Sequence, residues 1–435
     1  MQAVDLDSYI ETVNKSNPVR VYGRVVEITG ILIKCTGVNA AVGETCLIYS
    51  DTGAPLDAEV VGFKDGRMLL MATGDISLVR AGSRVRAMGR KVSVRVGTGL
   101  IGRVISESGE PLDSKGPIYA SHYPLYSTLV NPLQRERIRE AIDLGISAIN
   151  GLFTIGKGQR IGIMAGAGVG KSVLLGMMAK YTRADLNVIS LIGERNREVR
   201  EFIERDLGPE GMKRSVVVVT TSEQSPVAKV RNAFVATAIA DYFRAEGKDV
   251  LLFMDSLTRV AMAQREIGLA TGEPPASKGY TPSVFALLPK LLERAGTIKG
   301  KGSITGLYTV LVEGDDLTDP VADIATSILD GHIVLSRELA MENHYPAINI
   351  LRSISRVMPD IIEEKHKTSA GKFIETMAVY KRFEDMINLG AYKEGSNQKV
   401  DFALSMIDRL NGFLRQSMTE ARDFNTTLDL LYKLF

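Results

Sequence analysis

The stretch Ala165-Gly-Ala-Gly-Val-Gly-Lys-Ser172 decides the fold class of this sequence. It follows an apolar run at residues 160–164 that indicates a strand, and it opens a run at residues 171–180 that indicates a helix. A glycine-rich loop between a strand and a helix is the setting of a phosphate-binding P-loop. The loop departs from the strict pattern at its first position, because Ala165 stands where glycine is usual.

The chemistry of a P-loop predicts a role for each kind of residue in it. Successive backbone N–H groups curl around phosphate oxygens, and the helix N-terminus favours negative charge. Lys171 would hold the β- and γ-phosphates of a nucleotide, and the Ser172 hydroxyl would complete part of the shell of Mg²⁺. The predicted nucleotide-binding residues of the loop are Gly166, Ala167, Gly168, Val169, Gly170, Lys171 and Ser172.

Apolar runs that indicate strands alternate with helical runs from about residue 92 to residue 360. Further strands are expected at residues 187–192, 215–220, 249–254 and 331–335, and further helices at 197–207, 227–245 and 257–267. Such alternation is typical of a parallel sheet covered by helices. The sequence therefore predicts an α/β P-loop ATPase domain over residues 91–361.

The regions on either side of this domain have different patterns. Between residues 20 and 90, short β-rich pieces are separated by glycine turns at the spacing of a small β-barrel. Residues 362–435 contain amphipathic stretches that predict a C-terminal α-helical domain. In residues 1–19, Leu6, Ile10 and Val13 fall on one helical face, which favours a docking helix; the alternative is a segment that packs on its own barrel or frays.

Asp255 ends the buried-strand pattern of residues 249–255. A carboxylate at this place suits a Walker-B aspartate, which reaches Mg²⁺ directly or through water. Taken alone, the pattern is also typical of a strand that meets a helix cap, since Ser256 and Thr258 follow. Downstream of a P-loop, the metal-binding interpretation is favoured.

Glu194 follows the expected strand at residues 187–192. Ligands of a parallel sheet lie beyond the carboxyl ends of its strands, so Glu194 can face the γ-phosphate. We predict that Glu194 positions and polarises the attacking water. The alternative, a solvated acid at the start of a charged helix, fits Glu198 and Glu201 better.

Composition restricts the partners. The 53 basic and 51 acidic residues are mixed without long single-sign blocks, so no nucleic-acid binding is expected. Cys35 and Cys46 have no histidines nearby, which favours buried thiols over a zinc site. The acidic N-terminus and the lack of an apolar run of about 18 residues predict a cytoplasmic protein.

The order and spacing of these motifs resemble the rotary ATPase α/β superfamily over nearly the whole chain. Four motifs stand in that family's order: the P-loop, Gly193-Glu-Arg195, Leu252-Phe-Met-Asp255 and residues 346–356. Within it, residues 310–316, 327–337 and 413–416 resemble the export ATPases of type III secretion, and residues 390–396 look more like the flagellar branch than the injectisome branch. The resemblance implies a RecA-like core, hydrolysis of ATP to ADP and phosphate, and a homohexameric ring that energises flagellar protein export.

The resemblance also implies roles for single residues. Positions that match the family's catalytic residues are Lys171, Ser172, Glu194 and Asp255. Arg356 falls on the arginine finger of the family. Tyr345 falls on its adenine-stacking aromatic, although a tyrosine beside a proline is also common in a protein core. The second aromatic that usually packs on adenine has no counterpart near Met418.

The implied partners are those of an export apparatus. They are copies of the same chain, a stalk-like regulatory protein at the N-terminus, a stalk protein in the central channel, and an export gate with chaperones and exported flagellar proteins. The chain would be peripheral to the inner membrane at this apparatus. The segment at residues 270–280 would face the channel; the alternative is an ordinary surface connection.

Other functions are compatible with the same core. An injectisome export ATPase would share all the motifs. A nucleic-acid translocase would use a similar P-loop and finger, but the neutral charge counts against it. A non-catalytic ring subunit typically lacks an acid at the position of Glu194, and a subunit of a proton-translocating ATP synthase resembles the sequence less outside the motifs.

Overall fold

The computed structural model of the chain describes residue 10 and residues 20–50, 55–126, 130–312 and 319–435. The predicted helix at residues 1–19 lies outside the described residues, apart from Ile10. The chain divides into two compact units. One contains the part up to Val92 together with Ala270–Gly272, and the other contains Ser93–Leu269 and Glu273–Phe435.

The first unit is a closed antiparallel barrel of six strands. Its strands follow one another around the barrel in the order β1 (Gly23–Thr29), β2 (Leu32–Thr36), β5 (Arg67–Ala72), β4 (Leu56–Lys64), β3 (Glu44–Tyr49) and β6 (Arg84–Lys91). Both cysteines are free and point into its core, where burial raises the pKa of Cys35 to about 12 and that of Cys46 to about 11. The predicted barrel and buried thiols are confirmed.

The second unit is built on a mainly parallel sheet. From edge to edge its strands are β17 (Ile354–Ser355), β16 (Gly331–Val334), β10 (Arg160–Ala165), β15 (Ser303–Leu311), β13 (Asp249–Asp255), β11 (Leu186–Glu194), β12 (Ser215–Thr221) and β8 (Val104–Ser106). The short β14 (Gly296–Thr297) pairs with β15, and β7 (Ser93–Val96) pairs with β9 (Ser121–Pro124) in a separate ribbon. The neighbours from β16 to β8 are parallel, whereas β17 and β14 are antiparallel to their partners.

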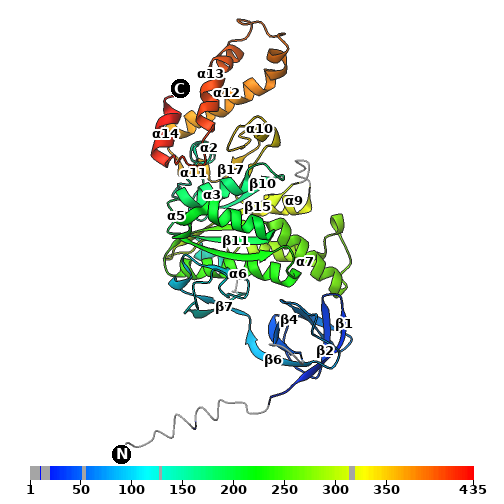
Figure 1. Cartoon of the computed structure of the whole chain (residues 1–435). Helices are drawn as coiled ribbons and strands as arrows, with labels where there is room; N and C mark the ends of the chain where they lie inside the picture. The colour runs from blue at the N-terminus through cyan, green and yellow to red at the C-terminus, as the bar shows by residue number, and fades with distance from the viewer. Residues whose placement is uncertain (1–9, 11–19, 51–54, 127–129, 313–318) are drawn as a thin grey trace, which may run out of the picture. The chain divides into compact units, whose positions relative to one another are not determined.

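Helices cover both faces of this sheet, which explains why its central strands are buried along most of their length. In Figure 1, α3 (Lys171–Tyr181) and α6 (Pro226–Ala245) lie on opposite sides of β11. The other helices between the strands are α2 (Ser147–Leu152), α4 (Asn196–Glu201), α5 (Gly208–Met212), α7 (Leu257–Thr271), α8 (Pro282–Leu292), α9 (Pro320–Ile328) and α10 (Arg337–Met341), and α11 (Met358–Ile361) follows the last strand.

The chain ends in three helices that pack on one another and on α2. They are α12 (Glu364–Asn388), α13 (Gln398–Leu414) and α14 (Phe424–Tyr432). Phe373, Phe413 and Leu431 from these helices share one hydrophobic core with residues of α2, α3 and the sheet. The predicted helical C-terminal region is confirmed, and its core is continuous with that of the ATPase region.

The structure differs from the sequence prediction in three places. The run at residues 197–207 forms α4 followed by a π-helical turn, Phe202–Leu207. The segment at 270–280 is shorter than expected because α7 continues to Thr271. The central strand β15 was not among the predicted strands. Among the described residues, none of the helices is both long enough and apolar enough to cross a membrane.

Candidate active site

The P-loop connects β10 to α3 and has a backbone that only glycine adopts easily. Gly168 and Gly170 have φ angles of 78° and 87°, in the left-handed region that strains other residues. Gly170 is the N-cap of α3, so the first N–H groups of the helix face the loop. This arrangement turns N–H donors and a positive helix end toward the place of a phosphate group.

Three charged side chains from three elements meet beside the loop. The Nζ of Lys171 donates a hydrogen bond of 2.5 Å to Oδ1 of Asp255 and lies 3.8 Å from Oε1 of Glu194. Asp255 also accepts a 2.7 Å hydrogen bond from the hydroxyl of Thr309 in β15. Its side chain is only 5% exposed and that of Lys171 is 13% exposed. The structure thus brings together the predicted phosphate-binding lysine, metal-binding aspartate and water-positioning glutamate.

Glu194 reaches this cluster because β11 is irregular at its end. The pairing of β11 with β12 shifts between Ile192 and Glu194, and Gly193 has a φ of 68°. A bulge of this kind changes the direction in which the following side chain points.

The environment of Glu194 changes its acidity. Burial raises the pKa of Glu194 to about 7, and the negative charge of Asp255 and a hydrogen bond with Glu198 contribute in the same direction. The positive charge of Lys171 opposes this shift. The same hydrogen bond lowers the pKa of Glu198. A carboxyl group whose pKa lies near neutrality is suited to exchanging a proton with water.

The oxygen donors beside the loop suit a hard divalent cation. Asp255 supplies a carboxylate and Ser172 a hydroxyl, both of which are ligands that Mg²⁺ accepts. No cluster of three or more His, Cys, Asp or Glu side chains that could hold a metal occurs in the described part of the chain. With Asp255 and Ser172 as protein ligands, Mg²⁺ would take its other ligands from phosphate oxygens and water, as is usual for this ion.

Arg356 follows β17 at the edge of the sheet. Its exposed guanidinium group donates to the carbonyl oxygens of Leu329 and Thr326 at 3.4 and 3.3 Å. In the described chain it makes no hydrogen bond or ion pair with Lys171, Glu194 or Asp255, nor with any other acid. The structure therefore does not bring Arg356 into the cluster beside the P-loop of its own chain.

Asp330 joins the backbone of Arg356 to the strand that leads into the P-loop. Its carbonyl oxygen accepts a 2.9 Å hydrogen bond from the N–H of Arg356. Its carboxylate accepts from the guanidinium group of Arg160, at the start of β10, at 3.1 and 3.2 Å. The position of Arg356 is thus fixed relative to β10.

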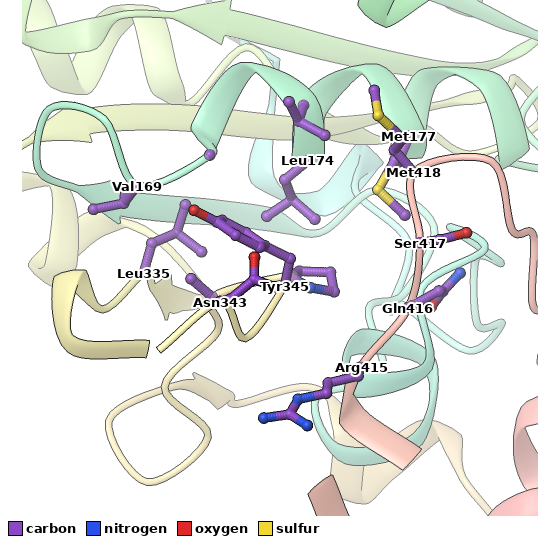
Figure 2. A pocket seen from close by; sticks show the side chains of 14 residues that line it. Val169, Leu174, Met177, Leu335, Asn343, Tyr345, Arg415, Gln416, Ser417 and Met418 are labelled. Atoms are coloured by element: carbon purple, nitrogen blue, oxygen red, sulfur yellow. The ribbon is translucent and has the colours of Figure 1, made fainter. Parts of the chain in front are cut away.

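A cavity of about 560 Å³ lies beside the P-loop (Figure 2). The ring of Tyr345 borders it and lies so close to Gly170 that a Cβ on that residue would come within 3.3 Å of the ring. Apolar side chains of α3, including Leu174 and Met177, form another part of its wall. The cavity combines an apolar lining with one aromatic ring, which suits a nucleotide base.

Sequence reasoning missed one wall of this cavity. Residues 415–418, which follow α13, line it, and Met418 and Met177 both border the cavity (Figure 2). The family resemblance implied an aromatic residue at this place, but the flexible thioether of methionine can pack on a flat ring as well. No sequence motif marks such a residue, because its position depends on tertiary contacts.

Comparisons with known proteins identify the family. The ATP synthase alpha/beta family nucleotide-binding domain matches residues 145–355, and the T3SS EscN ATPase C-terminal domain matches residues 362–433. The flagellum-specific ATP synthase of Bacillus subtilis is 51% identical over 421 residues, which are 95% of each chain. The chain belongs to the type III export ATPase family. The type 3 secretion system ATPase of Xanthomonas euvesicatoria, a relative from outside the flagellar group, is 48% identical over 95% of this chain and 93% of its own.

Solved structures of the family have the same fold. The assembled ATPase EscN of enteropathogenic E. coli matches with a TM-score of 0.89 and 42% identity, over 95% of this chain and 99% of that one. EscN in complex with its central stalk EscO matches with a TM-score of 0.87. As a member of the export ATPase family, the chain is an ATP-hydrolysing enzyme that uses a nucleotide with a divalent metal. The predicted fold, family and activity are confirmed.

Proposed function

We propose that this chain is the ATPase of a flagellar export apparatus and that it works as a homohexameric ring on Mg-ATP. The observation that carries the proposal is the meeting of Lys171, Asp255 and Glu194 beside a P-loop with an adjoining base-sized cavity. The flagellar branch is favoured because the flagellum-specific relative is the more similar of the two described above. An injectisome ATPase is the alternative.

Each residue of the cluster has a part in the proposed mechanism. Lys171 leaves Asp255 and binds the β- and γ-phosphates, while the backbone N–H groups of the loop surround their oxygens. Ser172 and Asp255 would hold Mg²⁺, which would supply positive charge to the phosphates. Glu194 in its ionised form accepts a hydrogen bond from the attacking water and draws away its proton. Tyr345 stacks on the adenine ring.

Arg356 completes the proposed site from a neighbouring subunit. Its guanidinium group is exposed and, among the described residues, donates to two carbonyl oxygens and to no acid, so we expect it to be available to a γ-phosphate across a subunit boundary. An arginine in this position stabilises the charge of the transition state and is worth about 10³–10⁵ in rate. A ring of identical chains supplies such a neighbour to every site.

Mixing two inactive variants tests the ring and the finger together. Lys171→Ala lacks the phosphate-binding cation and Arg356→Ala lacks the finger, so neither is expected to hydrolyse ATP alone. In mixed rings, some boundaries join an intact P-loop to an intact finger, and partial activity should return. Mixed rings that assemble but remain inactive at every ratio would contradict a finger that acts in trans.

The partners follow from the same proposal. We expect a central stalk protein in the channel of the ring, near the segment at residues 270–280, because EscN binds such a stalk. A stalk-like regulatory protein would bind residues 1–19, and the export gate, chaperones and exported flagellar proteins would meet the ring on the cytoplasmic side of the inner membrane. In the source bacterium, loss of the gene should abolish motility, and wild type but not Glu194→Gln should restore it.

A further inference from the structure

The wall of the cavity formed by residues 415–418 is not part of a helix or strand. It follows directly after α13, which ends at Leu414, and precedes α14. A loop at this place needs specific contacts if it is to hold a fixed position against a ligand. Two polar side chains, Gln416 and Arg422, make these contacts, and we call them the clasp.

Gln416 uses all of its side-chain hydrogen-bonding groups inside the protein. Its Oε1 accepts from the N–H of Ser147 at 3.0 Å, and its Nε2 donates to the carbonyl oxygens of Gly145 and Glu420 at 2.7 and 2.8 Å. Only 4% of the residue is exposed. Because Gly145 and Ser147 lie at the start of α2, these bonds attach the loop to the ATPase core.

The backbone of Gln416 also joins the two walls of the cavity. Its N–H donates a 3.0 Å hydrogen bond to the carbonyl oxygen of Tyr345. The residue therefore connects the side of the cavity that carries Tyr345 to the side that carries Met418, so that a shift of one wall displaces the other.

Arg422 fixes the same loop from its other end. Its guanidinium group donates to the carbonyl oxygens of Phe413 and Arg415 at 3.0 and 3.1 Å and to the hydroxyl of Ser147 at 3.3 Å. Its backbone N–H donates to the carbonyl oxygen of Gly145 at 3.2 Å. Both members of the clasp thus hold the end of α13 and the loop against the same short segment before α2.

We propose that Gln416 is a positioning residue that determines the affinity of the site for the base end of the nucleotide and couples that affinity to the position of α13. The proposal rests on the nucleotide site proposed above. Gln416 does not lie among the residues assigned to the phosphates. Its substitution should therefore weaken the binding of the base and leave the binding of a phosphate chain unchanged. A movement of the helical domain would reach the cavity by the same route, through α13 and the clasp.

The test compares ATP with tripolyphosphate, which has the phosphate chain but no base. Gln416→Met keeps the length of the side chain and removes its three hydrogen bonds. We expect the KM for ATP to rise by about tenfold, or about 1.4 kcal/mol, with kcat changed by less than about twofold, because the chemistry of the phosphates is not altered. The inhibition constant of tripolyphosphate should stay at the wild-type value.

Val400→Ala is the matched control. Val400 is fully buried in the first turn of α13, at the end of that helix away from the loop, so the change removes two buried methyl groups and leaves every hydrogen bond of the clasp in place. It should lower the melting temperature and leave the constants for ATP and tripolyphosphate unchanged. If Gln416→Met does not fold, Arg422→Lys is the alternative variant. It loses part of the hydrogen bonds that hold the same loop, so it should also raise the KM for ATP.

Equal weakening of ATP and tripolyphosphate in the clasp variants would overturn the inference, since it would indicate a general loss of structure. An unchanged KM in a folded Gln416→Met protein would overturn it as well. Failure of the nucleotide site itself has a different signature: tripolyphosphate would then not compete with ATP in the wild type.

Discussion

The acidity of Glu194 predicts how the rate of the enzyme depends on pH. The nucleotide-free protein has a Glu194 whose pKa is raised to about 7 by burial, by Asp255 and by Glu198. The proposed role of Glu194 requires the ionised carboxylate. Because kcat/KM reports the ionisation of the free enzyme, it should decline as the pH falls below about 7.

The size of this decline follows from the pKa. One pH unit below the pKa, roughly a tenth of a carboxyl group is ionised, so kcat/KM at pH 6 should be about a tenth of its plateau. Glu194→Gln keeps the size of the side chain but cannot ionise. It should bind ATP and lose about 10²–10⁴ in kcat, which is the usual contribution of a positioned base.

The assay is a series of steady-state rates between pH 5.5 and 8.5 for three proteins. Wild type should show the acidic limb, and Glu194→Gln should be slow and lack it. Glu198→Gln removes a neighbour that raises the pKa of Glu194, so its limb should move to lower pH while its rate at pH 8 is retained. Near-normal turnover by Glu194→Gln, or an unchanged acidic limb in that variant, would remove Glu194 from the mechanism.

Three other changes test the remaining parts of the site. Lys171→Ala should weaken Mg-ATP binding by about ten- to a hundredfold in a fluorescent-nucleotide titration, because it removes a charged hydrogen-bond donor; wild-type affinity would contradict the P-loop assignment. Tyr345→Ala should raise the KM for ATP by about tenfold through loss of stacking, whereas Tyr345→Phe should not. Deletion of residues 1–14 should leave the melting temperature unchanged and weaken ring assembly or partner docking in sedimentation experiments; unfolding of the truncated protein would assign the segment to the barrel.

The residues at strand ends were predictable because one rule governs them. Glu194 and Asp255 each stand at the end of an apolar run, Lys171 ends the loop that follows another, and the carboxyl ends of parallel strands meet at one edge of a sheet. Arg356 and Tyr345 carry no such local signal. Their roles depend on groups far away in the sequence or in another chain, so resemblance to a family was needed to select them.

The central strand β15 was missed because its pattern is mixed. Thr305 and Thr309 interrupt its apolar residues, although both are fully buried. The hydroxyl of Thr305 accepts from the N–H of Gly158, and that of Thr309 donates to Asp255. Polar residues in a buried strand satisfy partners that only the folded chain brings near. The wall formed by residues 415–418 escaped prediction for the same reason.

Asp330 gives the proposed ring a mechanical property that a single subunit does not have. Through one residue, the strand that ends in the P-loop is tied to the backbone of Arg356, the proposed finger of the next subunit. A displacement of β10 when nucleotide arrives or phosphate leaves would therefore be passed to the neighbouring site over a path of only a few bonds. Sequential hydrolysis of ATP around the ring would then require no external regulator. The nucleotide occupancy of each subunit would directly affect the active site of the next.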